Sequence, residues 1–586
     1  MNEEKNFNGL KNDEGINNLN SNTFEEKVEE ANIENPILSD EIETKKKKNI
    51  KLIVLLSILL LIGIGVGIYL ILNNKNNIQK PDELPNHETK NEEKNEDYLA
   101  YKLTGNSISD FDLYFLKLEN NGKNKVYSPL SIKYALEMLH EGANGKTKEQ
   151  IANIIGEYSP KKYPNNKNMS FANAMFIKNS YKDFIKSSYK DNLIEKFNAE
   201  VIYDSFDSPD KVNSWVSDKT FKLINGLVND ISDLDFILVN ALAIDMEWVN
   251  KIQPEDWSWG EGYIHEDYSK FVQGLSSEGG EGSNYYNLKF NSKNVASVEV
   301  GALINKYDIV KDMGEEKIRK IVGEAYQKWL DEDAIEESCE EDPANEPDVE
   351  TFLKSYLEEL NGNYKKIDAS TDFSFYIDDN VKVFVKDLKE YEGTTLEYIG
   401  IMPTKMSLTD YINNLNADKI NGLLNNIKPF ALESFAEGKI TDLTAYIPMF
   451  NYNYELNLMS DLNKLGITNI FDENKADLSN LTSKKAVINK ALHKSTIEFS
   501  NSGIKAAAVT LMGGAGAGEC GFDYIFEIPK SKIEKIDLTF NKPYLYLIID
   551  KKTKEVWFAG SVYEPSLYDE YVKNVKFESD WEDDYE

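Results

Sequence analysis

One long apolar run near the N-terminus contains no charged residue and extends from Leu52 to Leu72. Its 21 residues (72 − 52 + 1) would form a helix of about 31 Å at ~1.5 Å per residue, which matches the apolar thickness of a bilayer. A cleaved signal peptide is the alternative, but its apolar part is only ~7–15 residues long and no small-x-small cleavage site follows Leu72. The run therefore predicts a transmembrane signal-anchor helix, residues 50–73, that contacts the lipid bilayer through Leu52 to Leu72.

The lysines around this helix predict its orientation. Five lysines lie between residues 45 and 51, whereas only Lys75 and Lys80 follow closely. Because positive charge stays on the cytoplasmic side, we expect a single-pass protein of the cell membrane with its N-terminus in the cytoplasm and everything after Leu72 extracellular. Residues 1–49 are rich in Asn, Glu and Lys and predict a disordered cytoplasmic tail, and residues 74–97 predict a polar linker.

From residue 98 onward, apolar residues recur at both helical and strand spacing. Tyr127–Leu139 begins with Ser-Pro and predicts a helix. Phe236–Trp248 is nearly all apolar, as in a strand covered on both faces, and Asn240 inside it must find hydrogen-bond partners. A strand, a helix and a strand are predicted in turn for Leu443–Tyr454, Met459–Phe471 and Lys485–Phe499. The mixture indicates an α+β fold.

The region from about residue 252 to 371 differs from its surroundings, and we expect an acidic helical insertion there. Apolar residues recur at helical spacing over Glu315–Asp333 and again from Phe352 to Leu360. The run Asp331–Asp342 resembles a cation site by charge alone, but it lacks the glycine and the spacing of a calcium loop. A solvated acidic surface is the favoured interpretation. Residues 567–586 predict an acidic C-terminal tail with no assigned role.

The charge balance and the cysteine count exclude several classes of protein. Lys plus Arg is 66 and Asp plus Glu is 100, so the net charge of −34 repels phosphate backbones and excludes nucleic acid as the main partner. With 2 cysteines and 4 histidines, neither a disulfide scaffold nor a thiolate or His-rich metal site is expected. We therefore predict no metal and no cofactor. Whether Cys339 and Cys520 form a disulfide stays open.

The segment Ser500–Gly518 is compatible with both a strand and a loop. If it is extended from Ile504, one face consists of Ile504, Ala506, Ala508, Thr510 and Met512. The other face carries Lys505, the only charge in the segment, with Ala507, Val509 and Leu511. Gly513–Gly518, in contrast, is typical of a flexible loop. Both properties hold together only if the segment moves.

Several stretches resemble the serpin family and occur in the same order along residues 98–566. They are Tyr127–Leu139, Leu238–Trp248, Ile447–Phe471, Asn489–Thr510, Phe540–Asp550 and Val556–Pro565. The resemblance implies an α+β fold with three β-sheets, surrounding helices and a mobile reactive-centre loop. It also implies a suicide substrate: a target serine or cysteine protease cleaves the loop, forms an acyl-enzyme and is trapped when the loop inserts into the main sheet.

The resemblance also assigns residues to these roles. The hinge would be Gly503, Ile504, Lys505, Ala506, Ala507, Ala508, Val509 and Thr510, and the cleaved bond would be Ala517–Gly518. A polar cluster beneath the sheet, where strands must part, would be Ser128, Ser131, Asn240 and His493, with Trp248 near the point of first insertion. A small residue at the bond favours elastase-like or subtilisin-like proteases with shallow pockets.

Two departures from the family pattern and three alternatives bear on this interpretation. Asn501 stands where the family has an acid, and Ile504 where it has Thr, but neither change introduces a buried charge or a proline. An enzyme using His493 with Ser495, or Cys520 with a histidine, would lack an orienting acid at a diagnostic spacing. The glycine run lacks the ending of a phosphate loop. A non-inhibitory serpin-fold protein that acts as a surface binder or scaffold is the main alternative.

Overall fold

A computed structural model describes residues 100–252, 263–264, 270–272, 286–300, 302–331, 347–362, 372–504, 522, 524–527 and 529–574. The predicted cytoplasmic tail, membrane helix and linker lie outside these residues, as do most of the reactive-centre loop and most of the C-terminal tail. Among the residues that are described, we find no helix that combines the length and apolar character required to cross a bilayer.

The largest sheet has seven strands, and each neighbouring pair is hydrogen-bonded in antiparallel fashion. Its order is β1 (Lys125–Tyr127), β23 (Val556–Val562), β22 (Tyr544–Asp550), β13 (Leu396–Pro403), β12 (Val381–Asp387), β11 (Phe373–Ile377) and β14 (Lys428–Pro429). Every residue of β13, β22 and β23 is buried. This sheet is therefore continuous, with no break between neighbouring strands, and its central strands are buried in the main core.

A second sheet is divided into two parts. One part contains β3 (Glu200–Asp204), β2 (Met169–Lys178) and β4 (Phe236–Ile244). The other contains β17 (Phe450–Asn457), β18 (Leu492–Phe499), β19 (Gly503–Ile504) and β5 (Met246–Glu247). Only Asp245 separates β4 from β5, so these two strands continue one another. The parts join through β5, β19 and β18, and no pairing between β4 and β18 is recorded along their described lengths.

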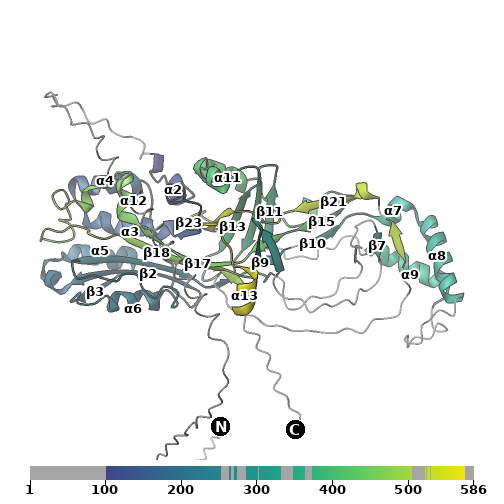
Figure 1. The fold of residues 1–586 in the computed structure, drawn as a ribbon, viewed down its shortest axis with the longest axis horizontal. Helices are drawn as coiled ribbons and strands as arrows, with labels where there is room; N and C mark the ends of the chain where they lie inside the picture. The colour runs from purple at the N-terminus through teal and green to yellow at the C-terminus, as the bar shows by residue number, and fades with distance from the viewer. Residues whose placement is uncertain are drawn as a thin grey trace, which may run out of the picture. The chain divides into compact units, whose positions relative to one another are not determined.

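Helices cover both faces of β4. Leu242 and Ile244 belong to the main hydrophobic core, whereas Val239 and Ala241 belong to a second core. That second core includes residues of α6 (Asp210–Lys219), and the main core includes residues of α3 (Pro129–Gly142). The prediction of a strand covered on both faces is therefore confirmed. Figure 1 shows α5 and α6 beside β2 and β3.

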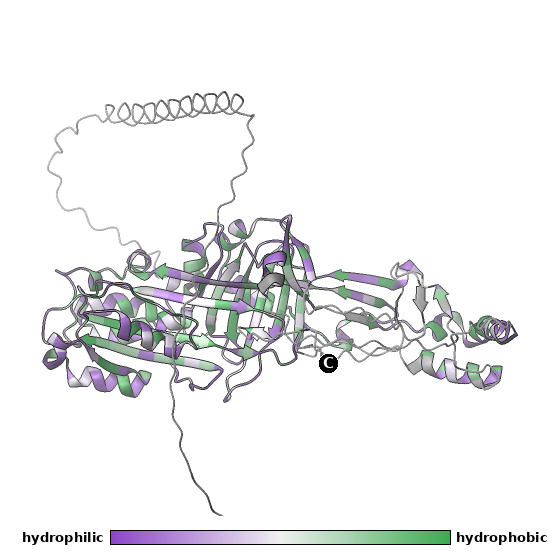
Figure 2. Cartoon of the chain, turned by 60° about the horizontal axis from the view of Figure 1, so that its bottom comes forward, coloured by the Kyte–Doolittle hydropathy of each residue, from purple (hydrophilic) through white to green (hydrophobic). Residues whose placement is uncertain are grey.

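Helix α3 forms at the predicted place for identifiable reasons. Ser128 is its N-cap and accepts a hydrogen bond from the Ser131 amide, and Pro129 occupies the first helical position, where no amide hydrogen is needed. The remaining helices of this region are α2 (Asp110–Leu118), α4 (Gly145–Ile155), α5 (Ser187–Phe197), α10 (Leu408–Asn413), α11 (Ala417–Leu424), α12 (Leu458–Lys464) and α13 (Tyr568–Asn574). Figure 2 shows helices with hydrophobic residues on one side and hydrophilic residues on the other.

Three smaller sheets complete the strands. They are β16 (Tyr446–Pro448) with β9 (Lys293–Glu299) and β8 (Tyr286–Phe290), β10 (Ala302–Asn305) with β15 (Ile440–Thr444) and β21 (Ile533–Asp537), and β20 (Ile525–Glu527) with β7 (Lys270–Val272) and β6 (Tyr263–Ile264). Beyond one end of β10, β15 and β21 lie α7 (Ile309–Met313), α8 (Glu315–Asp331) and α9 (Val349–Gly362) (Figure 1). We call α7, α8, α9, β6 and β7 the arm.

Comparison with the predicted elements shows where the pattern succeeded. The two helices expected near residues 315 and 352 are present as α8 and α9, and the α+β class is confirmed. The single strand predicted for Leu443–Tyr454 is wrong, because this run divides into β15, β16 and β17, which belong to three different sheets. The breaks fall at Ala445 and Met449, which are both buried. The strand predicted from Lys485 begins only at Leu492. The described strands form six separately hydrogen-bonded sheets, two of which are the parts of the divided second sheet.

Candidate functional site

The space between β4 and β18 is the candidate functional site. Two cavities lie along it, each lined by β4 on one side and β18 on the other. Leu242, Ile244, Ile497 and Ile504 line the first. Asn240, His493 and Ser495 line the second. Two strands that run in the same direction therefore face each other across an opening.

One end of this opening is already occupied by β19. Gly503 pairs with Glu247 and Ile504 with Met246 on one side, and Ile504 pairs with Phe499 on the other. The strand approaches so closely that a Cβ atom on Gly503 would lie 2.2 Å from the Met246 carbonyl oxygen, so only glycine fits here. The first two residues of the predicted hinge are thus an internal strand in this structure.

Trp248 holds the turn that precedes β19. Its backbone amide donates to the Ser502 carbonyl at 3.0 Å, and its indole nitrogen donates to the Ser500 carbonyl at 3.0 Å. The side chain is fully buried against Phe499 and Tyr398. Trp248 therefore lies at the point where the loop leaves β18 and turns back into the sheet, which is where the family resemblance places it.

A group of small polar residues lies beneath the second cavity. The Ser128 amide donates to His493 Nε2 at 2.9 Å, and the Ser495 hydroxyl lies 2.8 Å from the same nitrogen. Loss of solvation lowers the pKa of the buried His493 to about 4, so its imidazole is neutral at physiological pH. His493 and Ser495 are both buried, so this pair is not accessible from solvent.

Asn240 faces the same cavity from β4 and is only half satisfied. Its Nδ2 donates to Asn173 Oδ1 at 2.6 Å, and Asn173 in turn donates to the Phe197 carbonyl at 2.9 Å. The buried Oδ1 atom of Asn240 has no hydrogen-bond partner. A buried acceptor without a donor is costly and favours any rearrangement that supplies one. Sequence reasoning missed Asn173, because nothing in the pattern distinguishes it from a surface residue.

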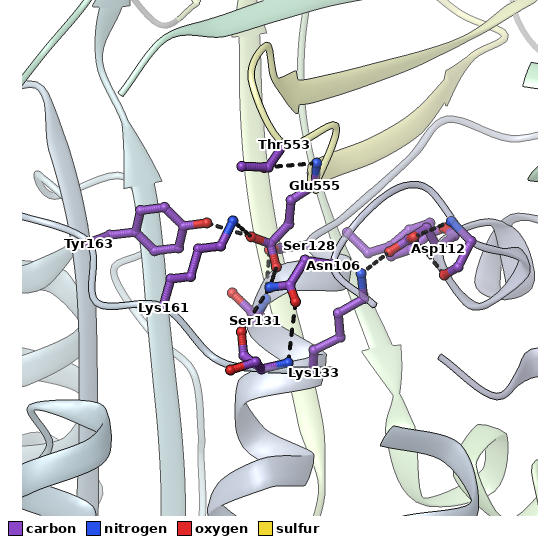
Figure 3. A network of polar contacts seen from close by, with 12 residues as sticks. Asn106, Asp112, Ser128, Ser131, Lys133, Lys161, Tyr163, Thr553 and Glu555 are labelled. Carbon is purple, nitrogen blue, oxygen red and sulfur yellow. Dashed lines mark hydrogen bonds and ion pairs between the residues drawn. The ribbon is translucent and has the colours of Figure 1, made fainter. Parts of the chain in front are cut away.

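Ion pairs fix the helix that carries Ser128 and Ser131. Figure 3 shows Lys133 on this helix, and its Nζ atom lies 2.6 Å from Asp112 Oδ1, with both side chains fully buried. Nearby, the Tyr163 hydroxyl donates to Glu555, whose pKa is raised by burial. The Lys133–Asp112 ion pair therefore joins α3 to α2. These residues carry no periodic signal and were not predicted.

The structure brings together most of the predicted site residues that it describes. Ser131, Asn240 and His493 line one cavity, and Ser128 bonds to His493. Trp248, Gly503 and Ile504 meet at the other end of the opening. The predicted residues outside the described part are Lys505, Ala506, Ala507, Ala508, Val509, Thr510, Ala517 and Gly518. Within the described residues, no three histidine, cysteine or acidic side chains are grouped so as to hold a metal ion.

Comparison with protein families identifies the family to which this chain belongs. The family "Serpin (serine protease inhibitor)" matches residues 110–300 and 349–565. The chain belongs to the serpin family. A serpin-like protein of Methanosarcina acetivorans with no characterised function is 21% identical over 493 residues, covering 80% of this chain and 89% of that one. Alpha-1-antiproteinase S of Cavia porcellus is 28% identical over 309 residues, covering 52% of this serpin and 66% of the relative.

The native state of the thermophilic serpin Tengpin aligns with a TM-score of 0.48 and 21% identity, covering 82% of this chain and 96% of that one. The family match leaves residues 301–348 of this serpin unassigned, and these include β10, α7 and α8. The family is one of protease inhibitors rather than catalysts.

Proposed function

We propose that this serpin inhibits a serine or cysteine protease as a suicide substrate. The protease would cleave the loop that follows Ile504 at Ala517–Gly518 and form an acyl-enzyme. It would be trapped when the loop inserts between β4 and β18. The observation that carries the proposal is the opening between these strands, one end of which already contains Gly503 and Ile504 as a paired strand. A strand that enters this opening would find hydrogen-bonding edges on both sides.

The register of β19 supports insertion of the residues that follow it. Both pairings are antiparallel, so each step forward along β19 moves one residue back along β5 and one residue back along β18. If both registers continue, Ala506 lies between Ile244 and Ile497, and Ala508 lies between Leu242 and Ser495. Small side chains would therefore meet the inner face of the sheet, where little space is available.

The same register gives Thr510 a specific position. It would lie between Asn240 and His493, so its hydroxyl group would reach the level of the buried Asn240 Oδ1 atom that lacks a donor. Insertion would thus replace an unsatisfied buried acceptor with a hydrogen bond. This gain exists only in the inserted state, which favours an inhibitor over a non-inhibitory binder.

The full chain, mixed with serine and cysteine proteases that have shallow pockets, tests the proposal. We expect a covalent complex with an elastase-like or subtilisin-like protease that survives denaturing electrophoresis, and mass spectrometry of the released fragment should place the cut at Ala517–Gly518. Ala508→Arg should abolish the complex but not folding, because a charge would enter the sheet unpaired. Ala508→Ser is the matched control and should retain inhibition.

Two results would overturn the proposal. If Ala508→Arg inhibits as well as wild type, the loop does not insert as described. If every protease cuts the loop and none is trapped, the chain is a non-inhibitory serpin that serves as a surface binder or scaffold.

We also propose that Leu52 to Leu72 anchors the serpin domain to the outer surface of the cell membrane. The lysine asymmetry around this run supports the orientation. In a variant in which Cys339 and Cys520 are replaced and Asn76→Cys supplies the only thiol, a membrane-impermeant maleimide should label the protein on intact cells. With Ser21→Cys as the only cysteine, labelling should require permeabilised cells. The reverse pattern would contradict the orientation.

A further inference from the structure

The described chain resumes after the reactive-centre loop at Phe522, five positions after Ala517 (522 − 517). The Phe522 ring lies among three aromatic rings of the arm. It makes edge-to-face contacts with Tyr326 at 5.2 Å and Phe352 at 5.6 Å between centroids, and it is 6.0 Å from Trp329. We call Tyr326, Trp329 and Phe352 the aromatic clamp. It contacts the C-terminal flank of the predicted cleavage site directly.

The clamp is held together by the packing of its two helices. Tyr326 of α8 and Phe352 of α9 stack with ring centroids 3.7 Å apart, and the Tyr326 hydroxyl donates to the Pro347 carbonyl at 3.3 Å. Gly323 allows the close approach, since a Cβ atom there would lie 3.1 Å from Leu353. These contacts join α8 to α9 without involving Phe522.

Further contacts attach the residues after Phe522 to the arm. β20 pairs with β7, and the ring of Phe526 in β20 is buried beside Tyr356 of α9. Lys532 forms an ion pair with Asp312 of α7 at 3.0 Å. Residues from α7, α8, α9 and β7 thus converge on residues 522–532, although they lie about 200 positions earlier in the chain. Two of these elements, α7 and α8, fall in the stretch that the family does not match.

We propose that Phe522 is a positioning residue that keeps the C-terminal side of the cut bond on the arm while the protease is carried away. This inference rests on the proposed function. Attack of the protease nucleophile on the Ala517 carbonyl forms the acyl bond and breaks the Ala517–Gly518 amide, and a proton passes to the leaving Gly518 amine. That amine can attack the acyl carbonyl and restore the loop as long as the two remain close.

The clamp limits this reversal by limiting the reach of the amine. Only residues 518–521 separate the new N-terminus from Phe522, which allows a displacement of about 14 Å at ~3.5 Å per residue. Insertion of the N-terminal side, in contrast, takes the acyl-enzyme along the full length of β4. With Phe522 in the clamp, insertion of about five residues, at ~3.3 Å each, would move the acyl carbonyl beyond this reach.

Phe522→Ala in the full chain tests the inference with two measurements. Hydrogen exchange of the amides of residues 524–527 should become about tenfold faster, because the variant loses the edge-to-face contacts of the Phe522 ring. The rate constant for complex formation should fall by a similar factor, while the number of serpin molecules consumed per trapped protease stays unchanged. A merely structural defect would increase that number, because slow insertion lets the acyl-enzyme hydrolyse.

Matched variants make the test specific. Phe522→Tyr should restore both values, and Phe352→Ala should have a smaller effect in Phe522→Ala than in wild type, since the two substitutions share one contact. Phe184→Ala, the same substitution at an exposed ring, should have no effect. Unchanged exchange in Phe522→Ala overturns the clamp, and faster exchange with an unchanged rate constant overturns its role in retention. If wild type traps no protease, the proposed function fails and the retention role with it, whereas the exchange result still measures the clamp alone.

Discussion

The two large sheets of this serpin share a core but differ in continuity. In the seven-stranded sheet every neighbouring pair is hydrogen-bonded, and aromatic rings such as Tyr398 and Tyr546 stack across adjacent strands at 5.6 Å. In the other sheet β4 and β18 do not pair along their described lengths, and polar residues such as Asn240 and Ser495 lie at that border beside apolar ones such as Leu242. A sheet that must open therefore has exchangeable hydrogen bonds at its border, and one that stays closed has interlocked rings.

Cleavage of the reactive-centre loop should change the melting temperature most, because it lets the loop insert as a strand between β4 and β18 and complete that sheet, which we call the gapped sheet. A net gain of about 5 kcal/mol would raise Tm by roughly 10–20 °C at ~2–4 °C per kcal/mol for a domain of this size. Calorimetry of the intact chain and of the chain nicked within residues 505–521 measures the shift. A protease site inserted between Lys552 and Thr553, in the β22–β23 turn of the closed sheet, should give no increase when cut. An unchanged Tm after nicking the loop would mean that the gap does not fill.

Lys133→Met should destabilise the contact between α3 and α2. The substitution leaves the fully buried Asp112 carboxylate without its cation, and loss of one partner of a buried pair costs about 4 kcal/mol. Urea denaturation should detect the loss, and the double variant Lys133→Met with Asp112→Asn should recover most of it. The increase in Tm on cleavage should persist in Lys133→Met, because that gain arises between β4 and β18. A loss below about 1 kcal/mol would contradict the structural role of the pair.

Acid should weaken the gapped sheet through His493. Its pKa falls from 6.5 when unfolded to about 4 when folded, so its contribution is complete above pH 6.5 and is lost as the pH falls toward 4. The loss is about 3 kcal/mol at ~1.36 kcal/mol per pKa unit. Burial raises the pKa of Glu137 to about 7, which acts in the opposite direction, so the useful quantity is the difference between wild type and His493→Gln. Equal pH slopes for the two proteins would show that His493 does not titrate in this way.

The elements with clear periodicity, α3, β4, α8 and α9, could be predicted from the sequence, because apolar spacing reports which face is buried. The division of residues 443–454 could not, since Ala445 and Met449 are as apolar as their neighbours. Ser128 and His493 were assigned to the cluster only through the family resemblance, whereas Asn240 stands out as a polar residue inside an apolar run. Asn173, Lys133 and the aromatic clamp were missed, because their partners lie far away in the chain and only tertiary contacts bring them together.

Reversal of the charge on Lys505 should have the smallest effect and should test the register of the inserting strand most directly. Continued pairing would place Lys505 between the half-buried residues Asp245 and Glu498, on the outer face of the sheet. Lys505→Glu would bring like charges together at a cost of ~0.2–1 kcal/mol per pair, which would slow inhibition by about fivefold at low salt. Because the groups are half exposed, most of this effect should disappear in 1 M salt, where the screening length is ~3 Å. Lys505→Gln should be intermediate, and Glu498→Lys combined with Lys505→Glu should recover part of the rate. If the combined variant recovers nothing, the inserted strand does not continue the register of β19, and the positions assigned to Ala508 and Thr510 would shift with it.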